Sequence, residues 1–249
     1  MSEVPIPANE LERLLQNAGR AVLVGGQALA FWIAFYAVRM DDVPGAIVTK
    51  DADFLGSRED ARRFSIVIGG TLEYPKNTSI LAGVVRKKIS ATEEFEVDVL
   101  RTLNGLSAAD VKKHAKQIAD STSGARYLVM SPMDCLVSRL ENIRSIAEKQ
   151  TEEGAWQARV AVRVARAYID ELLKNGQQRE AIRSATEVLR AATHAMGMNA
   201  FRKHGIDVLD AVPIEGYTTK TFIEQQWRRS VSRVEELRSV GASSTSRAE

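Results

Sequence analysis

Two aspartates separated by a single residue, Asp51 and Asp53, have the spacing that most directly indicates chemistry in this sequence. The segment from Ala46 to Leu55 is predicted to be extended, and residues two apart in a strand point to the same face. The two carboxylates therefore project together, and like charges at that distance repel unless a cation lies between them. Magnesium is the expected cation because it prefers carboxylate oxygens and substrate phosphates.

A third carboxylate, Asp98, lies in a second predicted strand, 94–100. The apolar side chains of this strand face one way, while Glu96 and Asp98 face the other. A neighbouring strand would bring Asp98 beside the aspartate pair. Three carboxylates can hold two metal ions for an in-line phosphoryl displacement.

A pair of glycines, Gly25 and Gly26, follows the short apolar run 21–24, which predicts a buried strand. A helix is expected from Gln27 to about Val38. The turn from strand to helix presents free backbone N–H groups at the positive end of the helix, where they favour phosphate. Glycine lets the phosphates approach because no Cβ intervenes.

Taken in order, these segments resemble the DNA polymerase beta-type nucleotidyltransferase superfamily. They are most similar to its compact bacterial branch, which includes abortive-infection and toxin–antitoxin nucleotidyltransferases. The resemblance covers roughly residues 10–145. Its motifs are Leu23-Val-Gly-Gly-Gln-Ala-Leu29, Thr49-Lys-Asp-Ala-Asp-Phe54, Glu96-Val-Asp-Val-Leu100 and the later segment Met130-Ser-Pro-Met-Asp-Cys-Leu-Val-Ser-Arg-Leu140.

The resemblance implies transfer of a nucleoside monophosphate from a nucleoside triphosphate, such as ATP, to an acceptor hydroxyl. Asp51 and Asp53 would bind metal, with two Mg²⁺ ions expected, and the triphosphate. Asp98 would complete the metal site and help to deprotonate the acceptor.

The nucleotide side of the implied site consists of Gly25, Gly26, Gln27, Lys50 and Arg139. The glycine turn would hold the phosphates, and Lys50 would orient the substrate. Arg139 would clamp a phosphate, since a guanidinium forms bidentate bonds to phosphate oxygens. Gln27 stands where many members of the superfamily carry a small hydroxyl residue.

The elements that must position these residues alternate between strands and helices and then become almost wholly helical. This pattern predicts an α/β (α+β) fold, in which a mixed-sheet nucleotidyltransferase domain over residues 1–150 precedes an all-helical C-terminal domain over 151–240. The small polar residues 241–249 predict a disordered tail. Helices are expected at 58–68, 108–119, from Ser131 onward, and at 153–174, 177–195 and 218–240.

Composition limits the possible environments and partners. The 34 basic and 32 acidic side chains give a net charge of +2, so any contact with a polyanion must come from a local cluster. The lone Cys135 excludes an intramolecular disulfide and a cysteine-based zinc site, which favours the reducing cytoplasm. The polar N-terminus lacks the pattern of a signal peptide. The longest apolar stretch, 27–38, is too short for a bilayer, so no membrane association is expected.

Several further polar clusters have competing interpretations. Arg86-Lys87-Lys88 either meets a phosphate backbone or protects an exposed strand edge. The stripe of Arg159, Arg163 and Arg166 is either a solvated helix face or a phosphate-binding surface. Arg228-Arg229 beside Trp227 either stacks on a base or flanks a partly buried ring. Asp41-Asp42 reads as a solvated turn, and the three histidines, His114, His194 and His204, lack metal-ligand spacing.

The leading hypothesis is a magnesium-dependent nucleotidyltransferase whose acceptor is an RNA, a protein or a small molecule. One alternative is a non-catalytic nucleotide-binding module that retains the fold. Another is a toxin–antitoxin component whose role is to bind a cognate partner protein.

Overall fold

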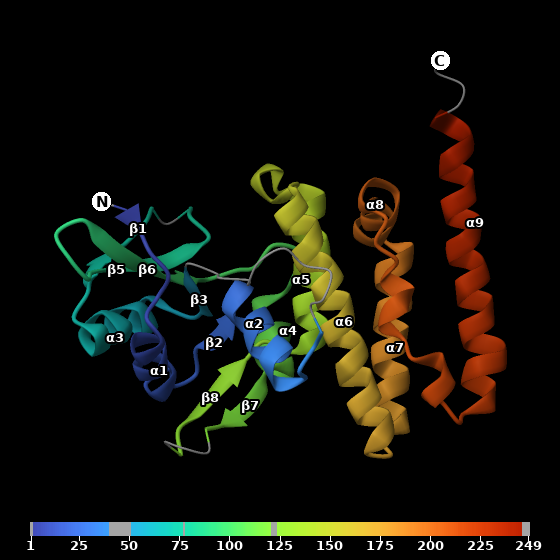
Figure 1. Ribbon diagram of the computed structural model, residues 1–249, viewed down its shortest axis with the longest axis horizontal. Helices are drawn as coiled ribbons and strands as arrows, with labels where there is room; N and C mark the ends of the chain where they lie inside the picture. Colours follow the sequence, from blue (N-terminus) through green and yellow to red (C-terminus); the bar gives the residue numbers. More distant parts are fainter. Residues whose placement is uncertain (1, 40–50, 77, 121–123, 246–249) are drawn as a thin grey trace. The chain divides into compact units, whose positions relative to one another are not determined.

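A computed structural model describes residues 2–39, 51–76, 78–120 and 124–245 (Figure 1). The chain divides into two compact units. The first comprises Met1–Ala34 and Asp41–Cys135, and the second Phe35–Met40 and Leu136–Glu249. The described residues form a mixed sheet and many helices, so the predicted α/β class is confirmed. Lys50 and the Asp41-Asp42 pair lie outside the described residues.

The first unit is built on a mixed sheet that has eight strands among the described residues, in the order β4-β5-β6-β3-β2-β8-β7, with β1 paired to β6. Strand β3 runs parallel to β6 on one side and antiparallel to β2 on the other. The strands are β1 (Ser2–Glu3), β2 (Val22–Val24), β3 (Ala52–Leu55), β4 (Thr71–Glu73), β5 (Leu81–Lys88), β6 (Glu93–Leu100), β7 (Lys116–Ala119) and β8 (Arg126–Val129).

One face of this sheet forms the apolar core of the first unit. Helix α3 (Arg58–Ile68) contacts β4, β5 and β6, and α1 (Ala8–Gln16) packs against α3 (Figure 1). The rings of Phe54 and Phe64 lie 4.6 Å apart between β3 and α3. Because side chains alternate along a strand, burying Phe95, Val97 and Val99 of β6 on this face leaves the acidic residues of β6 on the opposite face.

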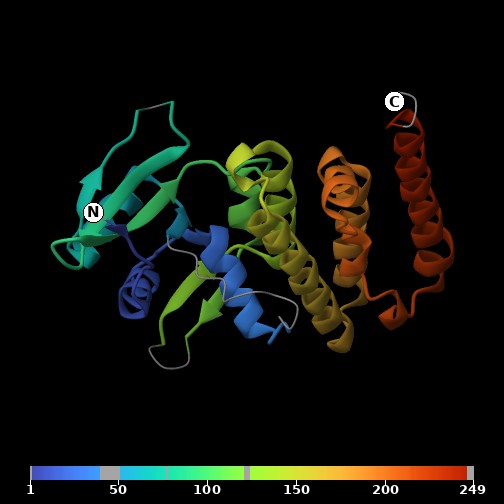
Figure 2. The ribbon, with the colours of Figure 1, turned by 45° about the horizontal axis from the view of Figure 1, so that its top comes forward.

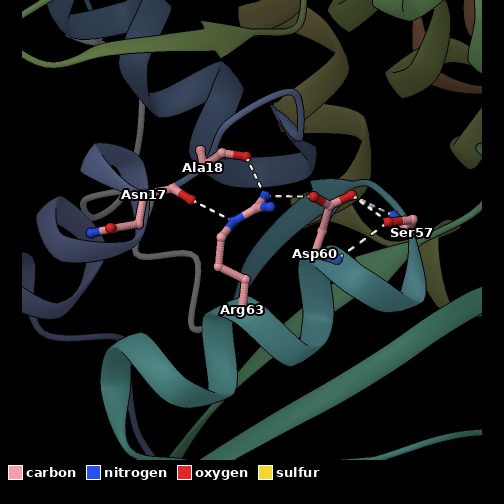
Figure 3. A network of polar contacts seen from close by, with 5 residues as sticks. All are labelled: Asn17, Ala18, Ser57, Asp60 and Arg63. Atoms are coloured by element: carbon pink, nitrogen blue, oxygen red, sulfur yellow. Dashed lines mark hydrogen bonds and ion pairs between the residues drawn. The ribbon is translucent and has the colours of Figure 1, made fainter.

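Helix α3 begins with a capping box formed by Ser57 and Asp60, at the residue where the sequence predicts the helix to start. The Ser57 hydroxyl accepts from the Asp60 amide, and the Asp60 carboxylate accepts from the Ser57 amide at 2.7 Å. Arg63, one turn further on, bonds Asp60 and the carbonyls of Asn17 and Ala18, so the cap also ties α3 to the end of α1 (Figure 3). The helix ends at Gly69, whose φ of 70° is accessible to glycine at little cost.

We expect Asp60→Asn to destabilise the protein by about 1–2 kcal/mol at pH 7, as judged by urea unfolding. Burial raises the pKa of Asp60, but the bonds from Ser57 and Arg63 outweigh it and lower the pKa below 3.8. The stabilisation is therefore present above the unfolded-state pKa and lost as the pH falls through the lower folded-state value. The loss on substitution should shrink toward pH 3, whereas a cost that is unchanged at pH 3 would contradict this account. Glu59→Gln, at an exposed neighbouring position, is the control.

The helix predicted over 108–119 is only half correct. Helix α4 (Ala108–His114) begins at the Ser107 cap, but the chain then forms strand β7, which pairs antiparallel with β8. Ladder pairing at the edge of the sheet satisfies the backbone groups of 116–119 and overrides their local helix preference.

The second unit is helical. Helix α5 (Pro132–Ser145) leads into it, and the Ser131 hydroxyl accepts from the Asp134 amide at 3.1 Å, so the predicted helix start is confirmed. The segment predicted as one helix over 218–240 is a π-helical stretch, η4 (Phe222–Trp227), followed by α9 (Arg228–Thr245). The remaining helices are η1 (Ala147–Lys149), α6 (Glu152–Lys174), α7 (Gln178–Thr193), α8 (Ala195–His204), η2 (Val208–Ala211) and η3 (Ile214–Gly216).

No helix within the described ranges has the length and apolarity needed to cross a membrane.

Candidate active site

The register of the sheet brings two of the predicted carboxylates side by side. Asp53 of β3 is the direct partner of Asp98 of β6, as the sequence predicts for a neighbouring strand. Parallel strands lie about 4.8 Å apart, so the two side chains leave the same face of the sheet as neighbours. Asp51 precedes Asp53 by two residues, at the entrance to β3. All three are only partly accessible to solvent.

The glycine turn packs directly onto this carboxylate pair. Val24, the last residue of β2, is paired with Asp53, so the next residue, Gly25, lies beside the Asp53 side chain. Gly25 has a φ of 65°, and a Cβ placed on it would lie 1.9 Å from the Asp53 Oδ2. Helix α2 (Gly25–Phe35) starts at this glycine, two residues earlier than the sequence predicts. Only glycine satisfies both the backbone angle and the contact.

Two further acids, Glu3 and Glu96, join the cluster. Burial, a hydrogen bond with Glu3 and the nearby charges raise the pKa of Asp51 to about 7. Burial and the charges of Asp53 and Glu96 raise the pKa of Asp98 to about 7 as well. Strand alternation already places Glu96 on the same face as Asp98, but no motif in the sequence gives it a role. Glu3 was missed because its two-residue strand β1 carries no recognisable pattern.

Two carboxylate oxygens in this cluster are buried without a hydrogen-bond partner among the described residues: Oδ1 of Asp51 and Oδ1 of Asp98. A buried polar atom without a partner is costly, and crowded carboxylates repel each other. Hard oxygen donors with unused lone pairs fit a hard divalent cation such as Mg²⁺. Across the described part of the chain, however, no three His, Cys, Asp or Glu side chains are arranged so that they could hold a metal ion. The chemistry of the donors therefore fits, whereas their side-chain positions do not converge.

The predicted nucleotide-side residues fall in different places. Gly26 and Gln27 lie in the first turn of α2, with Gly26 buried. Arg139 lies on α5 within the second unit, where it is 7% exposed and its Nη1 donates to the Gln157 Oε1 at 2.9 Å. The structure thus brings Gly25 and Gly26 to the carboxylates and gives Arg139 a buried partner in its own unit.

The basic segment Arg86-Lys87-Lys88 ends strand β5. Arg86 is paired with Thr71 of β4 and with Glu96 of β6, whereas Lys87 and Lys88 extend past the last paired residue of β4 and pair with β6 alone. The interpretation as edge protection is therefore wrong for Arg86 and stays open for the two lysines. Arg86 instead bridges Glu73 and Glu96, and Lys87 pairs with Glu10 at 2.6 Å. The bridge to Glu96 places one positive charge beside the acidic cluster.

The other candidates have structural roles. The Nδ1 of the exposed His114 lies 3.5 Å from the Oδ1 of Asp134. Cys135 is buried, as its place in the apolar register predicts. In the stripe Arg159, Arg163 and Arg166 each guanidinium donates to a backbone carbonyl of the second unit, and these contacts are solvent-accessible, with Arg159 exposed.

Comparison with known proteins adds little to this geometry. No family model matches the chain, and no curated protein matches it. Among solved structures, the chain is similar to the one titled "Crystal structure of JHP933 from Helicobacter pylori", with 12% sequence identity and a TM-score of 0.37 over 92% of this chain and 95% of that chain. A similarity of this size carries no inference about the fold or the site.

Proposed function

We propose that this protein is a magnesium-dependent nucleotidyltransferase that moves a nucleoside monophosphate from a nucleoside triphosphate to an acceptor hydroxyl. The observation that carries the proposal is the pairing of Asp53 with Asp98 against Gly25 at the start of α2. In this proposal the first unit is the nucleotidyltransferase domain.

The residues have distinct roles in this reaction. Asp51, Asp53 and Asp98 would hold Mg²⁺ only after their side chains turn toward a common point. A bound Mg²⁺ would supply neutralisation of phosphate charge for in-line displacement. Gly25 and Gly26 keep side chains away from the phosphates and present the amides of the first turn of α2. Asp98 would accept the proton of the acceptor hydroxyl as its oxygen bonds to the α-phosphorus. The bond from that phosphorus to the oxygen bridging the β-phosphate breaks, and pyrophosphate leaves with the negative charge.

Calorimetric titration with nucleoside triphosphates and Mg²⁺ tests this proposal. We expect the wild-type protein to bind only when Mg²⁺ is present, and Asp53→Asn to weaken binding at least tenfold, because it removes a full charge from the site. Asp110→Asn, an exposed position on α4, is the matched control and should bind like wild type. Binding that is equal in wild type and Asp53→Asn would contradict the assignment.

Transfer itself requires a second measurement. Labelled triphosphate would be incubated with the protein and a cell extract, and the RNA, protein and small-molecule fractions would then be separated. We expect label in one of these fractions with wild type and none with Asp53→Asn.

A non-catalytic nucleotide-binding module is the second candidate. It is favoured by the lack, among the described residues, of three side chains arranged to hold a metal. This candidate predicts triphosphate binding that persists in EDTA and no labelled product, the opposite of both results above.

A further inference from the structure

A groove of about 320 Å³ runs between α7 and α9 in the second unit. The two helices pack against each other, and both ribbon views draw them alongside one another (Figures 1 and 2). Leu189 contributes the buried apolar part of the lining, and the Gln226 Nε2 donates to the Thr186 Oγ1 at 3.1 Å. The other polar lining side chains are Arg190, Thr193, Arg229, Ser230 and Arg233.

The charge of this groove is all of one sign. Its three arginines are accompanied by hydroxyl and amide side chains, and none of the described lining residues is acidic. Arg190 and Arg229 are exposed, and their guanidinium groups form no hydrogen bond or ion pair within the described ranges. In the part of the chain that the structure describes, Arg233 pairs only with Glu236, one turn along α9, and both side chains are 63% exposed. Such a pair contributes little and separates readily.

The arginines of the other basic clusters, unlike those of this groove, have hydrogen-bond partners or acidic neighbours. The guanidinium groups of Arg159, Arg163 and Arg166 already serve backbone carbonyls. The pocket beside β5 that contains Arg86 is also lined by Glu73 and Glu94, which offset its positive charge. Since the chain as a whole carries only +2, attraction of a polyanion depends on a local excess such as that of the α7–α9 groove.

The groove offers the contacts that a phosphodiester backbone uses. Arginine donates two parallel hydrogen bonds to phosphate oxygens, and hydroxyl groups donate one. Arg229 and Arg233 are one helical turn apart, about 6 Å along α9, so they can meet successive phosphates. Arg190 faces them from α7 across the groove. An open, positively charged groove that follows the backbone is how proteins bind single strands without reading sequence.

We propose that the α7–α9 groove binds the phosphodiester backbone of a single-stranded nucleic acid. This goes beyond the proposed nucleotidyl transfer and does not rest on it, because the groove lies within the second unit and its residues are separate from the carboxylate cluster.

Fluorescence anisotropy with the full chain tests the proposal, using labelled 12-nucleotide RNA and DNA single strands of the same base composition. Wild type should bind at least one of the two strands, and comparison of the two shows whether RNA or DNA is preferred. The double variant Arg190→Gln/Arg229→Gln should bind at least tenfold more weakly at 0.1 M salt. The slope of log K against log salt should fall by about 1.4, because two phosphate contacts are lost.

The control is Arg20→Gln/Arg62→Gln, which removes two exposed arginines without partners in the described part of the first unit and changes the net charge equally. It should bind like wild type. Absence of binding by wild type overturns the proposal, as does an equal loss in both double variants, which would indicate a general charge effect. Polyglutamate of equal charge that competes as well as RNA would also overturn it, since the groove would then select acidic protein.

Both double variants should bind nucleoside triphosphate with Mg²⁺ like wild type. Failure of the groove proposal is therefore measured separately from failure of the proposed transferase site.

Discussion

Gly25→Ala is expected to abolish magnesium-dependent triphosphate binding and to lower the free energy of unfolding by roughly 2–4 kcal/mol. A Cβ at this position would lie 1.9 Å from Oδ2 and 2.8 Å from Cγ of Asp53. No real structure tolerates that separation, so either the Asp53 carboxylate or the start of α2 must move. Both are parts of the proposed site, and both would lose their alignment together.

Because the φ of Gly25 is positive, Gly25→Ala also carries a backbone cost that replacing any glycine in this conformation would carry. Gly69→Ala measures that backbone cost alone. Gly69 has a φ of 70°, and a Cβ there would meet nothing within 4 Å. We expect this control to lose only about 1–2 kcal/mol and to bind triphosphate normally. If both variants bind triphosphate equally well in calorimetric titrations, the contact between Gly25 and Asp53 has no role in the site.

Asp98→Asn is expected to eliminate nucleotidyl transfer and yet to stabilise the protein in EDTA by about 1 kcal/mol at pH 8, or roughly 2–4 °C in Tm. The carboxylate faces Asp53 and Glu96, and its Oδ1 is buried without a partner among the described residues. The amide removes one of the repelling charges. A residue retained at the expense of stability is typical of a functional site.

The pH dependence gives the sign of this effect. The pKa of Asp98 is raised from 3.8 to about 7, so the native state holds the proton more tightly than the unfolded state. The destabilisation by the wild-type carboxylate is absent below about pH 4. It grows between about pH 4 and pH 7, where the unfolded state ionises and the native state does not, and it is constant above about pH 7. The stability gain from Asp98→Asn in urea unfolding should follow the same course.

Asp110→Asn, at an exposed position, is the control for this series. It should not increase the free energy of unfolding at pH 4 or at pH 8. Added Mg²⁺ should raise the Tm of wild type but not that of Asp98→Asn. A variant that is less stable than wild type at pH 8 in EDTA would show that Asp98 makes favourable native contacts that outweigh the repulsion.

Local interactions explain what could be predicted from the sequence. The alternation of β6 places Glu96 and Asp98 on the face opposite the apolar side chains, because successive residues of any strand point to opposite faces. The capping box of Ser57 and Asp60 joins groups only three residues apart, so its pattern is readable in the chain. The same holds for Ser131 at the start of α5.

Contacts between distant residues explain what could not. The pairing of Asp53 with Asp98 was expected, but its parallel register and the approach of Gly25 depend on how β2, β3 and β6 assemble. Glu3 reaches the cluster through a two-residue strand with no pattern of its own. Strand β7 forms because its backbone pairs with that of β8, although its local sequence favours a helix.

The arginines show the same division. Their number and helical spacing are evident in the sequence, and on those grounds Arg159, Arg163 and Arg166 were the clearest basic stripe. The fold gives those three side chains carbonyl partners and leaves Arg190 and Arg229, 39 residues apart, facing one groove without partners among the described residues. The sequence by itself determined which charges exist and which face of each element they occupy, since those are properties of neighbouring residues. Only the tertiary structure decided which charges meet and which stay available, because long-range packing selects the partners and no local periodicity encodes it.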